Sequence, residues 1–176
     1  EEISPVVYKK MEHVRLQMQF YVEQMLYYAR TKSVNKEYLL EETDLEECCR
    51  EVLGEYRVYL EEKQVLVQMD FKEKIVLSDK KNLCFMLSQV ITNSIKYIGS
   101  NGISPAQIKI HSRIQENRIC LSLCDNGCGV KPYEIRYLFE KGFTGENSQK
   151  KSTGMGLYLV RQIGRELKIE IEAVSV

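Results

Sequence analysis

The chain has 176 residues, of which 44% are hydrophobic and 28% charged, and its formal net charge at pH 7 is zero. This length suits one domain with an extra element, and the hydrophobic content disfavours wholesale disorder. A neutral chain lacks the broad positive charge that nucleic-acid binding needs, so we expect no nucleic-acid partner. No run of about twenty apolar residues occurs, and the first residues, Glu1 and Glu2, do not begin a secretory signal.

The six cysteines include no CxxC pair. Three of them, Cys120, Cys124 and Cys128, are spaced four residues apart, which suggests a metal site. That spacing is not a usual zinc pattern, and no histidine lies nearby in the sequence to complete such a site. We therefore interpret the cysteines as reduced, buried thiols of a cytosolic protein.

The first third of the chain predicts one long helix, with Pro5 in its first turn. Apolar residues recur there at alternating gaps of four and three: Val7, Met11, Val14, Met18, Tyr21, Met25 and Tyr28. Such a heptad seam is typical of a coiled coil or helical bundle and needs a partner helix. The alternative is a helix that lies on the core of its own domain. The length of the seam favours the coiled-coil-like helix.

After a polar stretch at 31–36, the pattern changes to shorter elements. The predicted strands are 39–45, 65–71, 75–77, 107–113, 118–124 and 168–176, and the predicted helices are 45–63, 80–98, 132–139 and 154–167. Ser78 or Asp79 can cap the helix that begins at residue 80. The interleaved elements predict an α/β sandwich, in which helices cover one face of a mixed, mostly antiparallel sheet.

The segment QVITNSIKY, residues 89–97, lies on a predicted helix. Gln89, Asn93 and Lys96 are spaced four and three residues apart, so they share one helix face. An Asn side-chain oxygen suits Mg²⁺, and a Lys supplies a positive charge for phosphate. The alternative is a solvated helix face.

The segment DNGCG, residues 125–129, follows a predicted strand directly. Its two glycines allow a tight turn with a close backbone approach. The carboxylate of Asp125 could accept a hydrogen bond from an exocyclic amine such as that of adenine. Taken alone, however, the segment fits a common Asp-Asn-Gly turn equally well.

Two further segments lie around a polar, basic stretch. In FEKGFTGEN, residues 139–147, Phe139 and Phe143 bracket a glycine; the alternative is a surface loop anchored by aromatic rings. In STGMGLYL, residues 152–159, Gly154 and Gly156 open a predicted helix. Free N–H groups at a helix start bind phosphate, although glycine there can also serve packing alone.

In their order and spacing, the four segments resemble the four boxes of the ATP-binding domain of bacterial sensor histidine kinases. This is the Bergerat, or GHKL, fold, which gyrase, heat-shock-ninety and mismatch-repair ATPases share. The resemblance covers residues 43–176. The stretches YVEQMLYYAR at 21–30 and KGFTGEN at 141–147 are similar to those of intramembrane-sensing kinases that respond to antimicrobial peptides.

The resemblance implies two parts. Residues 1–36 would be part of the dimerisation and phosphoacceptor hairpin, namely its second helix. Residues 37–176 would be the ATP-binding catalytic domain, with its C-terminal strand truncated, because the family usually adds a Gly-containing turn and one more strand after Val174. The family often has a third glycine in its last box, where this chain has Ser152.

The implied ligands are ATP and Mg²⁺. Asn93 would ligate the metal ion, Lys96 would contact phosphate, and Tyr97 would line the pocket. Asp125 would bind the adenine amine. Two glycines would leave room for the adenine ring: Gly127 and Gly129.

The remaining implied residues surround the phosphates. Phe143 and Thr144 would begin a lid, and Lys150 or Lys151 would reach the γ-phosphate. Three residues at the last helix start would close over the triphosphate: Gly154, Gly156 and Leu157.

The implied activity is transfer of the γ-phosphoryl group to a histidine. The related hydrolases have a Glu where this chain has Gln89, near the expected γ-phosphate, and a Gln cannot take a proton. Of the two histidines, His13 lacks the Glu or Asp and the Pro that follow an acceptor, and His111 lies in a predicted strand. We expect the acceptor to lie outside this sequence, so that the fragment binds ATP without phosphorylating itself.

The implied partners are a second copy through the N-terminal helix, a response-regulator receiver domain and an ABC transporter. The implied location is the cytoplasmic portion of a membrane protein. Two other functions stay open: a non-catalytic, nucleotide-gated module for dimerisation and regulator binding, and a Bergerat-fold ATPase, which Gln89 disfavours.

Overall fold

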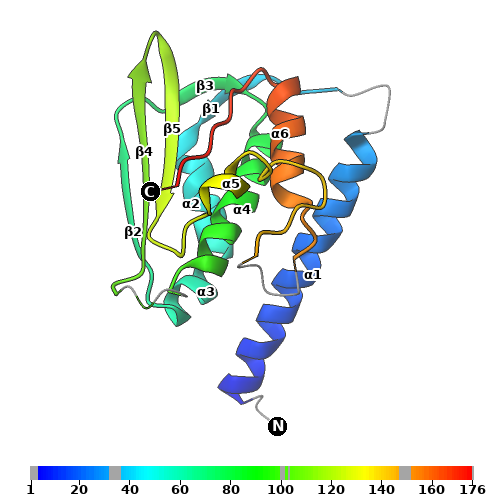
Figure 1. Ribbon diagram of the computed structural model, residues 1–176, viewed down its shortest axis with the longest axis vertical. Coiled ribbons are helices and arrows are strands. Elements are labelled where there is room, and N and C mark those ends of the chain that lie inside the picture. Colours follow the sequence, from blue (N-terminus) through cyan, green and yellow to red (C-terminus); the bar gives the residue numbers. More distant parts are fainter. Residues whose placement is uncertain (1–3, 32–36, 100–101, 103, 147–151, 176) are drawn as a thin grey trace.

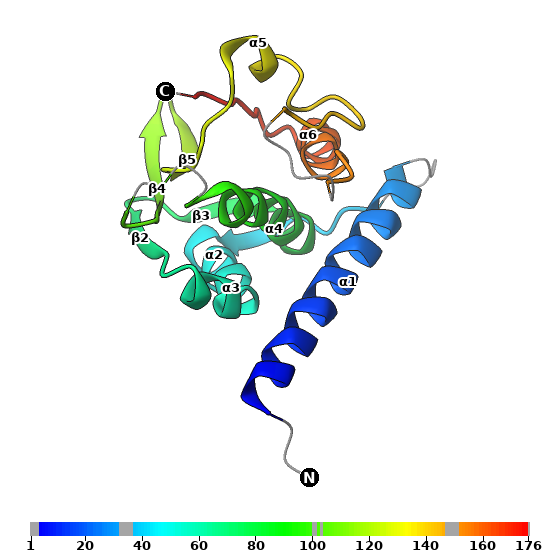
Figure 2. The same ribbon diagram turned by 60° about the horizontal axis from the view of Figure 1, so that its bottom comes forward.

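The computed structural model describes residues 4–31, 37–99, 102, 104–146 and 152–175 (Figure 1). Helix α1 (Pro5–Thr31) is a single helix of 27 residues, as the heptad pattern predicts. It runs along one side of the other elements (Figures 1 and 2). No helix among the described residues is both long enough and apolar enough to cross a membrane.

Helix α1 has two apolar stripes. One faces the rest of the chain, with Leu16 and Tyr27 as its most buried members, and the polar side chain of Gln24 is buried on the same face. The predicted heptad seam is a different stripe, and its members Val7 to Met25 include side chains that are 49–72% exposed. The helix therefore lies on its own domain, as the alternative interpretation holds, while the seam stays open to a partner helix.

The strands form two sheets. β1 (Glu41–Asp44) and β3 (Ile75–Ser78) pair antiparallel, and β2 (Leu66–Phe71), β4 (Gln107–Gln115) and β5 (Arg118–Asp125) form a sheet in the order β2-β4-β5. β2 runs parallel to β4, and β4 antiparallel to β5, so the predicted mixed, mostly antiparallel pairing is confirmed. The β4–β5 hairpin turns at Glu116 and Asn117, both with positive φ.

Among the described residues, the shorter helices after α1 are α2 (Leu45–Glu55), α3 (Arg57–Glu62), α4 (Lys80–Tyr97), α5 (Pro132–Ile135) and α6 (Gly156–Glu166). Figure 2 shows α2, α3 and α4 on one face of the β2-β4-β5 sheet, with α6 beyond α4. The predicted α/β sandwich with helices on one face is therefore confirmed.

Three predicted elements differ from the structure. The helix predicted at 45–63 is broken at Tyr56, whose backbone leaves the helical region (ψ 14°) while its ring is buried. The helix predicted at 132–139 ends at Ile135 and continues as turns. The strand predicted at 168–176 was wrong for 168–175, because Ile169 and Ile171 pack against α6 and its neighbours instead of joining a ladder of the described strands.

Two hydrophobic clusters support these layers. The larger joins α2 and α4 to the sheet, with Ile91, Ile108 and Ile110 at most 1% exposed. The smaller joins α1, α4 and α6 around Tyr27 and Leu159. Of the six cysteines, Cys48 and Cys49 are buried, but Cys120 and Cys124 are exposed on β5, so the prediction of buried thiols was wrong for these two.

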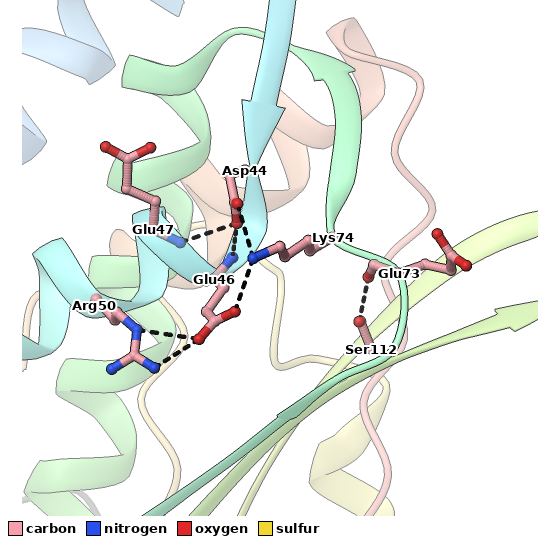
Figure 3. A network of polar contacts seen from close by, with 7 residues as sticks. All are labelled: Asp44, Glu46, Glu47, Arg50, Glu73, Lys74 and Ser112. Atoms are coloured by element: carbon pink, nitrogen blue, oxygen red, sulfur yellow. Dashed lines mark hydrogen bonds and ion pairs between the residues drawn. The ribbon is translucent and has the colours of Figure 1, made fainter.

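Helix α2 begins at a charged cap (Figure 3). The Asp44 carboxylate accepts hydrogen bonds from the N–H groups of Glu46 and Glu47, at 2.8 and 3.2 Å. The Lys74 ammonium lies 3.4 Å from Asp44 Oδ2 and 3.2 Å from Glu46 Oε2, so it ties the turn before β3 to this cap. At the start of α4, Asp79 rather than Ser78 is the cap, since its Oδ1 accepts from the Asn82 N–H at 2.9 Å.

Candidate nucleotide-binding site

Asp125 at the end of β5 is held against the end of α4. Its Oδ2 accepts a hydrogen bond from Ser94 Oγ at 2.7 Å, and its Oδ1 accepts from the Gly127 N–H at 2.9 Å. The residue itself is exposed. Two bonds from the protein therefore orient a carboxylate that still faces solvent, as recognition of a ligand amine requires. Ser94 is not among the residues predicted from the sequence, because its contact with Asp125 depends on how α4 packs beside β5.

The turn after Asp125 approaches α4 so closely that it needs glycine. A Cβ on Gly127 would lie 2.7 Å from Asp125 Oδ1 and 3.1 Å from the Tyr97 carbonyl oxygen. Gly129 has φ +65°, and a Cβ there would lie 2.9 Å from Ser175 Oγ, which also accepts the Val130 N–H at 2.8 Å. Backbone conformation and contact thus explain both glycines of the DNGCG segment.

The predicted polar stripe on α4 is divided by burial. Asn93, Lys96 and Tyr97 are each half-buried, and the Lys96 ammonium lies 4.9 Å from the centre of the Tyr97 ring. The Asn93 side chain makes no hydrogen bond to the part of the chain that the structure describes. Its amide oxygen is therefore available for a ligand, whereas the side chain of Gln89 is completely buried.

The Gln89 side chain contacts helix α1. Its Oε1 accepts a hydrogen bond from Gln24 Nε2 at 2.6 Å, and its Nε2 donates to Ser88 Oγ at 3.3 Å. A Cβ on Gly156 would lie 2.8 Å from Gln89 Oε1, so Gly156 serves close packing at the start of α6. Within the part of the chain that the structure describes, no side chain caps the N-terminus of α6, which leaves N–H groups there for a phosphate.

The segments around Phe143 and Gly154 meet backbone to backbone. The Gly142 N–H donates to the Gly154 carbonyl oxygen at 3.0 Å. Phe143 is half-buried, with its ring centre 6.0 Å from that of Tyr137, and Thr144 is exposed. Leu157 is half-buried at the start of α6. The predicted Lys150 and Lys151 lie outside the described residues.

Hydrogen bonds and an ion pair join α5 and Lys131 to Glu146, and the sequence did not predict these contacts. Glu134 is 6% exposed, and its Oε1 accepts a hydrogen bond from the Glu146 N–H at 2.9 Å. The Glu146 carboxylate is bound by the Lys131 ammonium and by Tyr133 OH, the latter at 2.8 Å. Because the Lys131 ammonium is the main partner, the pKa of Glu146 is below its ordinary value. These contacts fix residues 145 and 146 beside α5.

The described residues contain no group of three or more His, Cys, Asp or Glu side chains that could hold a metal ion. A groove of about 490 Å³ lies between α1 and α3, lined by Tyr8 and Val58 among others, and is remote from the four segments. Among the described residues of the four segments, the groups that could contact a nucleotide are the Asn93 amide oxygen, the Lys96 ammonium, the oriented Asp125 carboxylate and the N–H groups at the start of α6. The Asn93 oxygen fits Mg²⁺ that arrives bound to a nucleoside triphosphate, whose own oxygens complete the coordination.

Residues 78–175 match the protein family described as histidine kinase-, DNA gyrase B- and HSP90-like ATPase. The chain belongs to this family. The match covers the candidate site from α4 to the C-terminal segment, and it includes all four predicted segments. The predicted family resemblance is therefore confirmed.

Members of this family include sensor kinases similar to the chain. It is 30% identical over 178 residues to "Sensor histidine kinase YxdK" of Bacillus subtilis, covering 99% of this chain and 54% of the relative. It is 28% identical over 162 residues to "Sensor protein BceS" of the same organism, covering 91% of this chain and 47% of the relative. The chain thus spans about half the length of these curated relatives.

Solved structures show the same fold. Full-length ShkA in complex with AMPPNP is 22% identical, with a TM-score of 0.68 over 88% of this chain and 31% of that one. The histidine kinase ThkA, in complex with the response regulator protein TrrA, is 17% identical, with a TM-score of 0.65 over 99% of this chain and 50% of that one. The fold of a histidine kinase catalytic domain, preceded by a helix, is therefore established.

Proposed function

We propose that this chain is the ATP-binding catalytic part of a two-component sensor histidine kinase. It binds ATP with Mg²⁺, and the γ-phosphoryl group passes to a histidine nitrogen for relay to a response-regulator aspartate. The observation that carries the proposal is the Asp125 carboxylate, oriented by Ser94 and Gly127 while it stays open to solvent. The sensor-kinase relatives support the choice of reaction within the family.

In this proposal the chain positions ATP and neutralises its charge, which is most of what phosphoryl transfer requires. Asp125 accepts from the adenine amine, and Gly127 and Gly129 leave space for the ring. Asn93 ligates Mg²⁺, which supplies charge neutralisation on the phosphates when bound, and Lys96 adds a positive charge. The remaining contacts come from the lid and the last helix start: Tyr97, Phe143, Thr144, Lys150, Lys151, Gly154, Gly156 and Leu157.

Neither histidine is arranged as an acceptor. His13 stacks on Tyr59 with ring centres 4.3 Å apart, and its Nε2 lies 3.1 Å from Glu62 Oε2, although the two are not aligned for a hydrogen bond. His111 lies within β4, paired with Asp70 on one side and Ser122 on the other. These contacts support a structural role for both, with the acceptor supplied from elsewhere.

The partner proposals follow from α1 and from the relatives. The exposed heptad seam supports a homodimer through α1, since five of its apolar side chains are 49–72% exposed. The ThkA–TrrA complex supports a receiver domain as the downstream partner. An ABC transporter partner, and a membrane location for the whole protein, remain parts of the proposal that rest on the family resemblance.

A direct test combines binding with transfer. Titration calorimetry with Mg–ATP should give a Kd that rises at least about tenfold in Asn93→Ala but not in Asn82→Ala, at the other end of α4. A separate acceptor-helix fragment, incubated with the chain and ATP, should gain acid-labile phosphate. Binding without transfer would instead support the nucleotide-gated module, and repeated phosphate release without the acceptor would support an ATPase.

A further inference from the structure

Gln24 lies at the centre of the contact between α1 and the start of α6. Its side chain is only 5% exposed. Gln24 Nε2 donates to Gln89 Oε1 at 2.6 Å, and Gln24 Oε1 accepts from Thr153 Oγ1 at 3.1 Å. The carboxamide of Gln24 therefore joins α1 to α4 and to the segment that leads into α6.

The same carboxamide packs against the first residue of α6. A Cβ on Gly156 would lie 3.2 Å from Gln24 Nε2, besides its contact with Gln89. Thr153 Oγ1 also accepts the Met155 N–H at 3.3 Å. The position of Gln24 thus sets the position of the segment from Thr153 to Gly156.

Neighbouring residues on the same turn of α1 reach further parts of the site. Tyr27 stacks on Phe85 with ring centres 3.7 Å apart, and Lys141 Nζ donates to Tyr28 OH at 2.7 Å. One turn of α1 therefore contacts α4, the phenylalanine-containing segment and the last helix start. These are three of the four segments assigned to nucleotide binding.

A leucine at position 24 would keep the size of the side chain but would leave two hydrogen-bond partners unsatisfied, of which Gln89 is completely buried. Gln89 would lose its donor, and Thr153 would lose its acceptor. Orphaned polar groups in a buried network cost more than a single net hydrogen bond contributes. We expect α1 to separate from the start of α6, because the separation avoids the cost of these unsatisfied groups. The separation also releases the segment that is proposed to hold phosphate.

We propose that Gln24 is a positioning residue that couples docking of α1 to nucleotide binding at residues 153–157. The inference rests on the proposed function. Since coupling between two sites is reciprocal, a nucleotide bound at this segment stabilises the docked α1, and a docked α1 strengthens nucleotide binding.

The test uses the whole chain with AMPPNP and Mg²⁺. Calorimetry should show a Kd about tenfold higher for Gln24→Leu, and a Kd within about twofold of wild type for Gln17→Leu, the same change on the exposed face of α1. Hydrogen exchange should show that AMPPNP increases protection of amides 20–30 in the wild type and in Gln17→Leu. That increase should disappear in Gln24→Leu, which a merely structural role would not produce.

A second pair of variants covers the case in which Gln24→Leu does not fold. Thr153 is exposed, so Thr153→Val should fold, and it should weaken AMPPNP about threefold, whereas Thr153→Ser keeps the hydroxyl and should bind as wild type. Wild-type affinity in Gln24→Leu and Thr153→Val, or AMPPNP protection of 20–30 in Gln24→Leu, overturns the coupling alone. Failure of the wild-type chain to bind AMPPNP overturns the proposed function as well.

Discussion

The backbones of Gly142 and Gly154 are in direct contact, since the Gly142 N–H donates to the Gly154 carbonyl oxygen at 3.0 Å. Gly154 has φ +64°, and a Cβ on it would lie 2.4 Å from the Gly142 carbonyl carbon. Gly142 itself has φ +77° and donates its N–H to Gly154. Two glycines twelve residues apart therefore bring the phenylalanine-containing segment against the start of α6, where the resemblance places the triphosphate.

Gly154→Ala should weaken Mg–ATP binding at least about tenfold and lower the free energy of unfolding by about 1–3 kcal/mol. The alanine methyl meets backbone, which cannot move aside as a flexible side chain could. Calorimetry and chemical denaturation measure the two effects. Gly99→Ala is the matched control, since Gly99 has φ +77° but open space around it, so it tests strain without collision. Equal nucleotide affinities in the two variants would contradict this role of the contact.

Tyr27→Ala should lower the free energy of unfolding by about 3 kcal/mol. Tyr27 is 8% exposed and stacked on Phe85, and burial raises the pKa of its hydroxyl to about 12. Met25→Ala, at a seam position that is 72% exposed, should change stability by less than about 0.5 kcal/mol in the monomer. Urea denaturation of the two variants tests which face of α1 packs on the rest of the chain. A larger loss of unfolding free energy in Met25→Ala than in Tyr27→Ala would show that the heptad seam is the packed face.

Lys74→Met should make stability less dependent on pH in the acid range. Partial desolvation raises the pKa of Asp44, but hydrogen bonds from the Glu47 and Glu46 N–H groups and from Lys74 outweigh it, so that pKa is lowered overall. Hydrogen bonds from Arg50 and Lys74 lower the pKa of Glu46.

A lowered carboxyl pKa gives stability that is present above the unfolded pKa and is lost as pH falls through the folded one. The difference in unfolding free energy between wild type and Lys74→Met should therefore be present at pH 7 and shrink below about pH 4.5, as the carboxyls protonate. Lys72→Met, at an exposed lysine two residues away, should show no such trend. A difference that grows on acidification would rule out this network.

Much of the fold could be predicted because the hydrophobic period indicates the type of secondary structure. The heptad seam predicts α1, and alternation predicts β4 and β5, whose ends differ from the prediction by two residues or fewer. The final segment shows the limit of that signal: Ile169 and Ile171 alternate as a strand would, but they bury their side chains against α6 without a ladder. Periodicity predicts the type of element and which side chains share a face, but not what covers that face, and the seam of α1 stays exposed.

The site was predictable only where glycines and short motifs mark it. The roles of Gln24 and Ser94 depend on contacts across 65 and 31 residues of sequence, so no local pattern indicates them. Gln89 shows that a local pattern can also predict an exposure that the structure does not have. Its spacing places it on the face shared with Asn93, but the docking of α1 buries it completely.

The most direct measurement is the affinity of the chain for Mg–ATP and for Mg–GTP, in the wild type and in Asp125→Asn. The control is Asp70→Asn, at an exposed aspartate of β2. A carboxylate only accepts hydrogen bonds, so it suits the exocyclic amine of adenine and not the carbonyl oxygen that guanine has at the same position. The wild type and Asp70→Asn should therefore prefer ATP. Asp125→Asn, whose amide can also donate, should lose at least about tenfold in ATP affinity. Undiminished ATP binding by Asp125→Asn, or no nucleotide binding by the wild type, would contradict the account.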